Sequence, residues 1–452
     1  MKKISKRAWM AMALAMALLA GLLIFVGSYF VNAKTWVTFP GSPHVYTGVN
    51  PDCGRIYDRS GTLLLNTDDG RVYSTDETVR RSTMHLLGDR DGYISAPLLK
   101  TYASKMFGFD VVNGLYTDEP GSVAARLTIS AAVQSAAQQA LAGYRGTIGV
   151  YNYKTGELLC AVTSPSYDPD NVPDVANDTT GSYEGVYLNR FFDAAYTPGS
   201  IFKLVTAAAA LETIPDVQSR TFQCDGKTII GGQEIICNGV HGSLDLAGAL
   251  AHSCNVAFGE LAAELGAETL QDYAEKLGLT GSFSCEGYTV ASGKIDLSQA
   301  DDGDVAWAGI GQYNDLVSPM HAALMAAAVA NGGVMCEPRL LKSVGGNAVS
   351  RWGADKSVRV LSAETAQAVK QMMGKVVQQG TGTSAAVSGA VVYGKTGTAE
   401  YTENGEVKNH SWFVGFLDED HPYAVSVLFE GAGFGSAHAA PMAAEVFEYL
   451  LK

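Results

Sequence analysis

The segment YTPGSIFKLVTA, residues 196–207, has the features of a helix start that carries chemistry. Pro198-Gly199 predicts the entry into a helix, and Ser200 and Lys203 then share one face, one turn from each other. A serine hydroxyl is a weak nucleophile that needs a base beside it, and a lysine can be that base when burial lowers its pKa. The helix N-terminus favours the same shift, and the backbone N–H of Ser200 is placed to donate to a developing oxyanion.

A second motif lies in LAHSCNVAFGEL, residues 250–261, where Ser253 and Asn255 flank Cys254. A hydroxyl and an amide two residues apart can relay a proton and hold a substrate amide. An S-x-N motif alone is equally typical of a loop or a helix cap. The motif therefore gains its meaning from its neighbours along the chain.

The third motif is Lys395-Thr396-Gly397-Thr398, within a stretch that reads as a strand. On a strand, Lys395 and Gly397 face one way and the two threonines face the other. A glycine opposite a serine lets a substrate backbone lie along the strand edge, and lysine and threonine can meet a carboxylate.

The tripeptide K-T-G also occurs at residues 154–156, between GTIGVYN (146–152) and ELLCAVTS (157–164). The two flanking stretches are strand-like, so the tripeptide is predicted to be the turn of a hairpin. We expect this copy to be a turn without chemistry.

The stretch GAGFGS, residues 431–436, is predicted to be a tight turn rather than a dinucleotide-binding loop, because no βαβ unit can follow it.

Most helical patterns lie between residues 185 and 385, and strand patterns lie on either side of that region. We also expect a helix within residues 125–144, and another within 318–333 with Ser318 as its N-cap. Strands from both sides are predicted to share one antiparallel sheet, and the helical middle forms a second lobe.

The first residues predict a membrane anchor. Residues 1–7 carry basic side chains and no acidic ones, and residues 8–33 have no charge. As a helix, residues 8–33 would span roughly 39 Å, enough for a hydrocarbon core of about 30 Å. The basic end is expected in the cytoplasm and the bulk outside, with residues 34–124 as a small pedestal region. A cleaved signal peptide ending near residue 33 is the alternative interpretation.

Composition excludes some classes of function. The formal net charge of −14 argues against a nucleic-acid partner. The seven cysteines and eight histidines show no C-x-x-C or H-x-x-x-H spacing, so we expect no metal site and no cofactor. Cys224 and Cys237 flank a turn-rich stretch and are the best-placed pair for a disulfide in an exported chain.

The order S-x-x-K, S-x-N, K-T-G resembles that of the class B penicillin-binding proteins, membrane-anchored serine transpeptidases of cell-wall synthesis. The blocks that carry the resemblance run through most of the chain: GRIYDRSGTLLLN (54–66), TSPSYDPDN (163–171), NRFFDAAYTPGSIFKLVTA (189–207), GIGQYNDLVSPMHAALMAAAVANGG (309–333), GKTGTAE (394–400) and WFVGFLDEDHPYAVSVL (412–428). The resemblance implies a two-lobed α+β fold over residues 125–452. It consists of an antiparallel five-stranded sheet flanked by helices and a helical lobe.

The resemblance also implies roles. Ser200 would attack the penultimate D-alanine carbonyl of a peptidoglycan stem peptide, and Lys203 would take its proton. Ser253 with Lys395 would pass a proton to the leaving amine. The implied substrate-binding residues are Asn255, Thr396, Gly397 and Thr398, and the N–H groups of Ser200 and Thr398 would form the oxyanion hole.

The implied partners are D-Ala-D-Ala stem peptides and β-lactams, with a SEDS-family glycan polymerase beside them. A D,D-carboxypeptidase or β-lactamase on the same scaffold is one alternative function. A penicillin sensor or scaffold without catalysis is another, but it leaves the three intact motifs unexplained.

Overall fold

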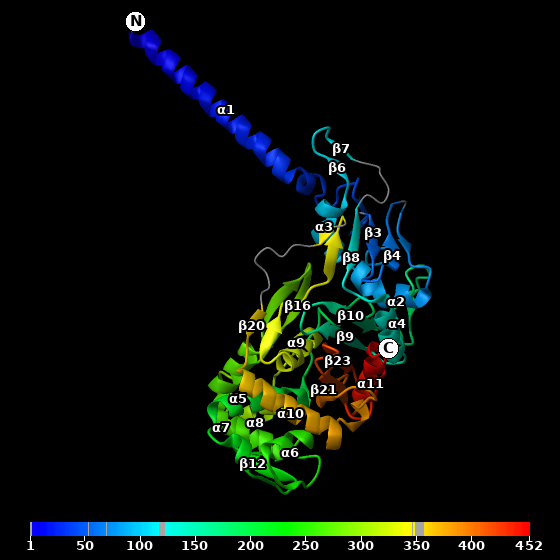
Figure 1. Cartoon of the computed structure of the whole chain (residues 1–452), viewed down its shortest axis with the longest axis vertical. Helices are drawn as coiled ribbons and strands as arrows, with labels where there is room; N and C mark the ends of the chain where they lie inside the picture. Colours follow the sequence, from blue (N-terminus) through cyan, green and yellow to red (C-terminus); the bar gives the residue numbers. More distant parts are fainter. Residues whose placement is uncertain (1, 53, 69, 117–122, 346, 349–356) are drawn as a thin grey trace.

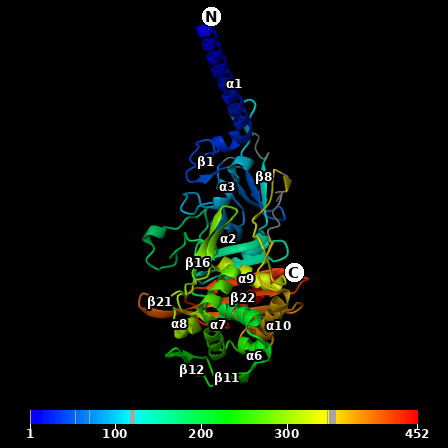
Figure 2. The same cartoon turned by 90° about the vertical axis from the view of Figure 1, so that its left-hand side faces the viewer.

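The computed structural model describes residues 2–52, 54–68, 70–116, 123–345, 347–348 and 357–452. Figure 1 shows a long N-terminal helix, a smaller region of strands and helices next to it, and a larger body beyond. The larger body combines a sheet covered by helices with a second lobe made mainly of helices. Figure 2 shows the same order along the long axis, with β11 and β12 at the end opposite the N-terminal helix.

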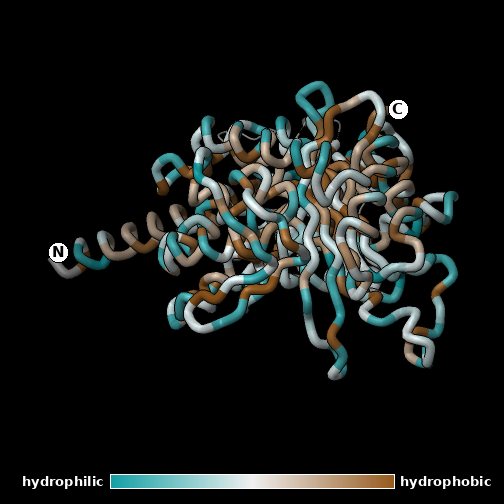
Figure 3. Tube along the Cα trace, turned by 90° about the horizontal axis from the view of Figure 1, so that it is seen from below, coloured by the Kyte–Doolittle hydropathy of each residue, from teal (hydrophilic) through white to brown (hydrophobic). Residues whose placement is uncertain are grey.

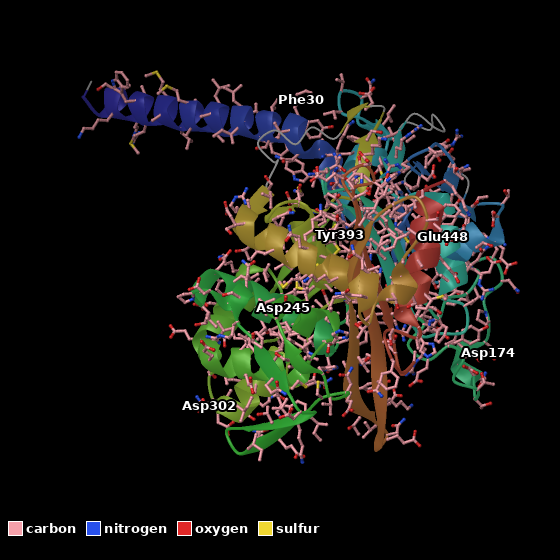
Figure 4. All side chains as sticks on the ribbon, turned by 60° about the horizontal axis from the view of Figure 1, so that its bottom comes forward. Phe30, Asp174, Asp245, Asp302, Tyr393 and Glu448 are labelled. Carbon is pink, nitrogen blue, oxygen red and sulfur yellow. The ribbon has the colours of Figure 1, made fainter. Side chains whose placement is uncertain are left out.

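Helix α1, Lys2–Val37, is the one helix among the described residues that is long and apolar enough to cross a membrane. Its apolar side chains project on all sides without neighbours along most of its length (Figure 4). Figure 3 shows hydrophilic colour near its N-terminal end and hydrophobic colour along its middle. Near its other end, the Tyr29 hydroxyl donates to the carbonyl of Val111 at 3.0 Å. An apolar helix of this kind is what the predicted anchor requires.

The smaller region is built on a six-stranded sheet that draws on distant parts of the chain. Its helices are α2, Glu77–Leu87, and α3, Pro97–Met106. The strand order is β19-β18-β8-β3-β4-β5. The strands are β3 (Arg55–Tyr57), β4 (Leu63–Asn66), β5 (Val72–Tyr73), β8 (Ala124–Leu127), β18 (Leu341–Val344) and β19 (Asn347–Ala348).

Asp58 links this sheet to the larger body. It is buried in the turn after β3 and accepts N–H groups from Ser60, Gly61 and Thr62, each at 2.8 Å. It also accepts the N–H of Ala131, at the start of helix α4, at 3.0 Å. Burial alone would raise the pKa of Asp58, but these hydrogen bonds outweigh it and lower the pKa. The carboxylate thus fixes the pedestal turn against the first helix of the larger body.

The sheet of the larger body has five strands in the order β10-β9-β23-β22-β21, and every neighbouring pair is antiparallel. The first hairpin of the body therefore pairs with the last strand of the chain. This joining of strands from both sides of the helical region confirms the predicted topology. The strands are β9 (Gly146–Asn152), β10 (Leu158–Ser164), β21 (Val392–Glu403), β22 (Glu406–Leu417) and β23 (Tyr423–Phe429).

Helices cover both faces of this sheet. Helices α4, Ala131–Ala140, and α11, Ala439–Leu450, pack on one face. Helix α9, Pro319–Ala330, packs against β9, β22 and β23 from the other face. All of α9 is buried, because its sequence is apolar around its whole circumference. Because helices cover both faces of the sheet, β9 and β10 are buried along their full length.

The second lobe consists of helices and two small two-stranded sheets, the hairpin β12-β13 and the pair β11-β14 that encloses it in the chain. Figure 4 places Asp245 and Asp302 on this lobe, where Asp245 caps α6 by accepting the N–H of Gly248. The elements are α5 (Lys203–Thr213), α6 (Leu246–Ala251), α7 (Asn255–Lys276), α8 (Asp302–Gly309), α10 (Ala363–Gln379), β11 (Phe222–Cys224), β12 (Lys227–Ile230), β13 (Gln233–Ile236) and β14 (Gly242–Leu244).

The predicted start of α9 is confirmed, whereas the predicted start of α4 lies several residues too early. Ser318 caps α9 as predicted, accepting the N–H of His321 at 3.2 Å. The helix expected within 125–144 begins only at Ala131, because Ser130 is its N-cap and the residues before it form β8. The tripeptide at 154–156 is the predicted hairpin turn between β9 and β10, and Gly156 has a φ of +75° there.

Candidate active site

Ser200 stands where the larger body's two lobes meet. It lies in a short 3-10 turn, Gly199–Phe202, that leads directly into α5. Gly199 has a φ of +54°, and a Cβ there would lie 2.3 Å from the carbonyl oxygen of Thr398. A Cβ on Gly397 would lie 3.0 Å from Cγ2 of Ile201. Two glycines therefore allow the serine turn to lie directly against strand β21.

Lys203 is fully buried, and its Nζ contacts Ser200, Ser253 and Asn255. Its closest partners are Asn255 Oδ1 at 2.6 Å and the carbonyl oxygen of Ser253 at 2.7 Å, which can only accept. A neutral amine gives its two N–H groups to these acceptors and keeps one lone pair. The Oγ of Ser200 lies 3.1 Å from Nζ, so its hydroxyl can donate to that lone pair. This is the geometry of a general base.

The electrostatics support the neutral form of the lysine. Burial lowers the pKa of Lys203 to about 7, while the thiols of Cys237 and Cys254 act in the opposite direction. Burial also lowers the pKa of Lys395 well below its ordinary value, and the nearby charge of Lys203 adds to this effect. Lys203 can therefore exchange a proton near neutral pH.

Ser253 joins the two lysines. Its Oγ lies 3.2 Å from Nζ of Lys203 and 3.0 Å from Nζ of Lys395, which also donates to the carbonyl of Thr396 at 2.7 Å. Ser253 has a φ of +56°, a conformation that residues other than glycine rarely adopt. The backbone around it must hold this strained turn in place.

A cleft of about 430 Å³ opens over these groups. The predicted residues Ser200, Ser253, Asn255, Thr396 and Thr398 line it. Several further residues line the cleft that no sequence motif indicated, namely Ile236, Cys237, Asn238, Trp307, Gln312, Thr381, Glu400, Phe434 and Ser436.

Strand β21 borders the cleft, and Thr396 and Thr398 lie on one side as the predicted strand alternation requires. Thr396 and Thr398 line the cleft, and the Oγ1 atoms of Thr396 and Thr381 lie 2.6 Å apart. The carbonyl of Thr398 accepts Nε2 of Gln312 at 3.3 Å, on the side away from β22. In a strand the N–H of a residue points to the same side as its carbonyl, so the N–H of Thr398 also faces this side.

Asn255 and the GAGFGS stretch, residues 431–436, take part in the site in ways that their sequence motifs did not indicate. Asn255 uses both amide atoms within the protein, because Nδ2 donates to the carbonyl of Ile236 at 2.7 Å while Oδ1 accepts from Lys203. The GAGFGS stretch is a turn as predicted, but it borders the cleft. Its Gly435 N–H donates to Oγ1 of Thr398 at 3.2 Å.

Comparisons with known proteins agree with this geometry. The family described as the penicillin binding protein transpeptidase domain matches residues 146–448. The chain belongs to this family. Peptidoglycan D,D-transpeptidase PbpA of Mycobacterium tuberculosis strain H37Rv is 30% identical over 391 residues, which cover 79% of this chain and 78% of that protein. Stage V sporulation protein D of Bacillus subtilis is 30% identical over 328 residues, covering 69% of this chain and 50% of that protein.

Solved structures of penicillin-binding transpeptidases have the same fold. The D,D-transpeptidase domain of a peptidoglycan glycosyltransferase from Eggerthella lenta is 29% identical, with a TM-score of 0.75, and covers 88% of this chain and 98% of that one. Penicillin-binding protein A from M. tuberculosis, in its ceftriaxone acyl-enzyme complex, is 25% identical with a TM-score of 0.75 and the same coverage. The chain is thus a class B penicillin-binding protein of the serine transpeptidase type, and the predicted two-lobed fold is confirmed.

Proposed function

We propose that this chain cross-links peptidoglycan stem peptides through an acyl-enzyme on Ser200, and that penicillin acylates the same serine. The observation that carries the proposal is the buried Nζ of Lys203, 3.1 Å from Oγ of Ser200. The related enzyme PbpA is named a peptidoglycan D,D-transpeptidase, which supports the choice of substrate.

Acylation begins when Oγ of Ser200 attacks the carbonyl of the penultimate D-alanine. The hydroxyl proton passes to the lone pair of Lys203 Nζ as the new C–O bond forms. The negative charge that develops on the carbonyl oxygen is held by the N–H groups of Ser200 and Thr398. Collapse of this intermediate breaks the C–N bond to the last D-alanine.

The leaving amine needs a proton at that moment. Ser253 is placed to deliver it, because its hydroxyl contacts both lysines. The proton that Lys203 took from Ser200 then passes to Ser253, so that Lys203 is neutral again, while Lys395 holds the Ser253 hydroxyl through its own contact with it. In the second half of the reaction, the amine of another stem peptide attacks the ester, the same groups act in reverse, and the cross-link forms.

Residues along the edge of β21 bind the substrate. The backbone of Thr396 and Thr398 faces the cleft, so a stem peptide can add to the sheet as an extra strand. The threonine hydroxyls are placed for the terminal carboxylate. Asn255 orients Lys203, and because it lines the cleft, its second Nδ2 N–H and second Oδ1 lone pair remain for the substrate amide.

The test is acylation by penicillin, followed by intact mass on the purified full chain, with Ser200→Ala as the control. We expect one stable adduct that the variant lacks. An adduct lost within seconds would assign the chain to the β-lactamases. A folded protein that forms no adduct would contradict catalysis and favour a scaffold role.

A second assay separates transpeptidation from carboxypeptidation. A synthetic stem pentapeptide is supplied with and without a second peptide that bears a free amine. Transpeptidation predicts a cross-linked product with loss of one D-alanine, whereas a carboxypeptidase gives only the hydrolysed tetrapeptide. Product masses distinguish the two outcomes.

We also propose the orientation and the division of the chain. Basic residues in 1–7 favour a cytoplasmic N-terminus, with residues 8–33 in the membrane and the bulk outside. Residues 34–124 then form most of the pedestal, to which β8, β18 and β19 add strands, and the rest of 125–452 forms the transpeptidase domain. Protease protection in inverted membrane vesicles tests the orientation, since it should shield all but the N-terminal tail.

We further propose that a SEDS-family glycan polymerase binds the membrane end of the chain. The motivation is the exposed apolar surface of α1 next to the pedestal region. Co-purification of the full chain with that polymerase in detergent should occur. It should fail when α1 is replaced by an unrelated membrane helix.

A further inference from the structure

Three cysteines and a histidine gather immediately beside the active site. The ligand atoms of Cys224, Cys237, His241 and Cys254 all lie within 4.8 Å of one another. The first three come from the hairpin region between β11 and β14, and the fourth precedes α7. Cys224 and Cys254 are completely buried, and Cys237 is nearly so. No other such cluster of metal-ligating side chains occurs among the residues that the structure describes.

The distances within this cluster are those of a tetrahedral metal site. Sγ of Cys237 lies 3.9 Å from Sγ of Cys254 and 3.5 Å from Nδ1 of His241. Sγ of Cys224 lies 3.6 Å from the same Nδ1. With Zn–S bonds of about 2.3 Å and Zn–N bonds of about 2.0 Å, tetrahedral angles place two sulfurs about 3.8 Å apart, and a sulfur and a nitrogen about 3.5 Å apart.

Backbone N–H groups point at two of the sulfurs. The N–H of Asn255 donates to Sγ of Cys237 at 3.2 Å, and the N–H of Ala257 donates to Sγ of Cys254 at 3.5 Å. Such donors stabilise the negative charge of a metal-bound thiolate and orient it. They are supplied by the N-terminus of α7, which favours negative charge as well.

We propose that Cys224, Cys237, His241 and Cys254 bind one zinc ion as a closed Cys₃His site. Thiolate-rich tetrahedral sets select zinc, and four protein ligands leave no position for a substrate, so the ion is structural. Binding replaces the protons of three thiols, which are released, and leaves a net charge of −1 on the site.

The position of the zinc site suggests that the ion holds the turn at Ser253 in place. Cys254 stands between Ser253 and Asn255, the two residues that hold Lys203. A zinc ion ties this strained turn to the hairpin region, to which it is otherwise joined by weaker contacts. The ion would therefore keep the Ser253 turn in its working position without contacting the substrate.

The alternative is a disulfide, for which Cys224 and Cys237 were the predicted pair. That prediction is wrong for this structure, where both cysteines are free. A disulfide also requires the two sulfurs to be about 2.05 Å apart. It would use only two of the four side chains and leave His241 without a role.

The absence of C-x-x-C and H-x-x-x-H spacing argued against a metal site, but short spacings do not detect ligands that lie far apart in the chain. The ligands are separated by long intervals along the chain, and a short C-x-x-C motif is absent. The hairpin region and the start of α7 bring them together only after folding.

The experiment measures zinc in the full chain, purified in detergent with an affinity tag that contains no histidine. We expect about one zinc ion per chain by elemental mass spectrometry. After chelation, cobalt(II) added alone should give the intense visible absorption of tetrahedral thiolate-bound cobalt. Wild-type protein without zinc that also gives no such spectrum would overturn the proposal, as would an intact mass lower by two hydrogens from a disulfide.

Variants identify the ligands. His241→Ala should lose the zinc, and His241→Cys should keep it, because a fourth thiolate replaces the imidazole. The matched control is Cys160→Ser, a buried cysteine in β10, which should keep the zinc. Equal zinc content in His241→Ala and in wild type would contradict the assignment even if both fold well.

The effect on the active site is measured separately. Removing zinc from wild type should slow penicillin acylation of Ser200 by about 10-fold or more, and adding zinc back should restore it. An unchanged rate in zinc-free protein would contradict the positioning role. Because the zinc content needs no catalysis, the metal site can hold or fail independently of the proposed transpeptidation.

Discussion

Nζ of Lys395 lies 3.0 Å from Oγ of Ser253, although 142 residues separate them along the chain. Both side chains are buried, and Lys203 contacts the same serine oxygen from the other side. The two lysines thus share one hydroxyl. Burial lowers the pKa of both lysines, and the charge of Lys203 lowers the pKa of Lys395 further.

Replacing Lys395 tests which K-T-G copy carries the chemistry. Lys395→Met should slow penicillin acylation by about 10²–10⁴-fold, because Ser253 loses its proton partner. The matched control is Lys154→Met in the other copy, which lies at a hairpin turn and should leave the rate unchanged. The measurement is the acylation rate with a fluorescent penicillin. Equal rates for the two variants would contradict the assignment of the copy at 395.

The acylation rate should depend on pH through Lys203. Its folded pKa is about 7, below the ordinary 10.5, so the amine is mostly neutral above neutral pH. Only the neutral form can accept the proton of Ser200, so the rate should rise with pH and level off above about 7. The second-order rate constant for acylation, measured across pH, gives the midpoint. A midpoint near 10.5 would show that Lys203 is not shifted in this way.

Gly397 should tolerate no side chain. A Cβ there would lie 2.9 Å from Cβ of Trp412 and 3.0 Å from Cγ2 of Ile201, so Gly397→Ala should push the serine turn away from β21. We expect a loss of about 1–3 kcal/mol of stability and slower acylation. Gly259→Ala is the control, since its neighbours lie at 3.4 Å or more and alanine favours its helix. Thermal unfolding compares them, and similar melting temperatures would argue against the steric explanation.

Asp58 should stabilise the link between the pedestal and the larger body. Asp58→Asn removes a charge that accepts four backbone N–H groups, and should cost about 2 kcal/mol at neutral pH. Because the folded pKa is lowered, the stabilisation is present above the ordinary value of 3.8 and is lost as pH falls through the folded value. The difference from wild type should therefore shrink in acid.

The control for Asp58 is Asp178→Asn. Asp178 also accepts backbone N–H groups, but they come from its own loop, at Thr180 and Tyr183. We expect a smaller loss of stability from this change. Thermal unfolding of both variants at neutral pH measures the two losses of stability. An equal loss would mean that the hydrogen bond from Ala131 adds no stability.

Local rules predicted much of this protein from its residues. The spacing of Ser200 and Lys203 placed them on one helical turn, and alternation along β21 placed Thr396 and Thr398 on the same face of the strand. Ser318 capped its helix as expected, and the hairpin at 154–156 formed between the predicted strands. Each of these features depends on residues close together in the chain, so the sequence pattern contains the information.

The tertiary structure alone decided what distant segments do together. Parallel pairing of β3 with β8 and addition of β18 built the pedestal sheet, which no local pattern indicated. The loop at 431–436 became part of the cleft rim because Gly435 packs against β21. The four metal-binding side chains met for the same reason. Sequence spacing determines which face a side chain takes, but packing of the whole chain determines which other side chain it meets.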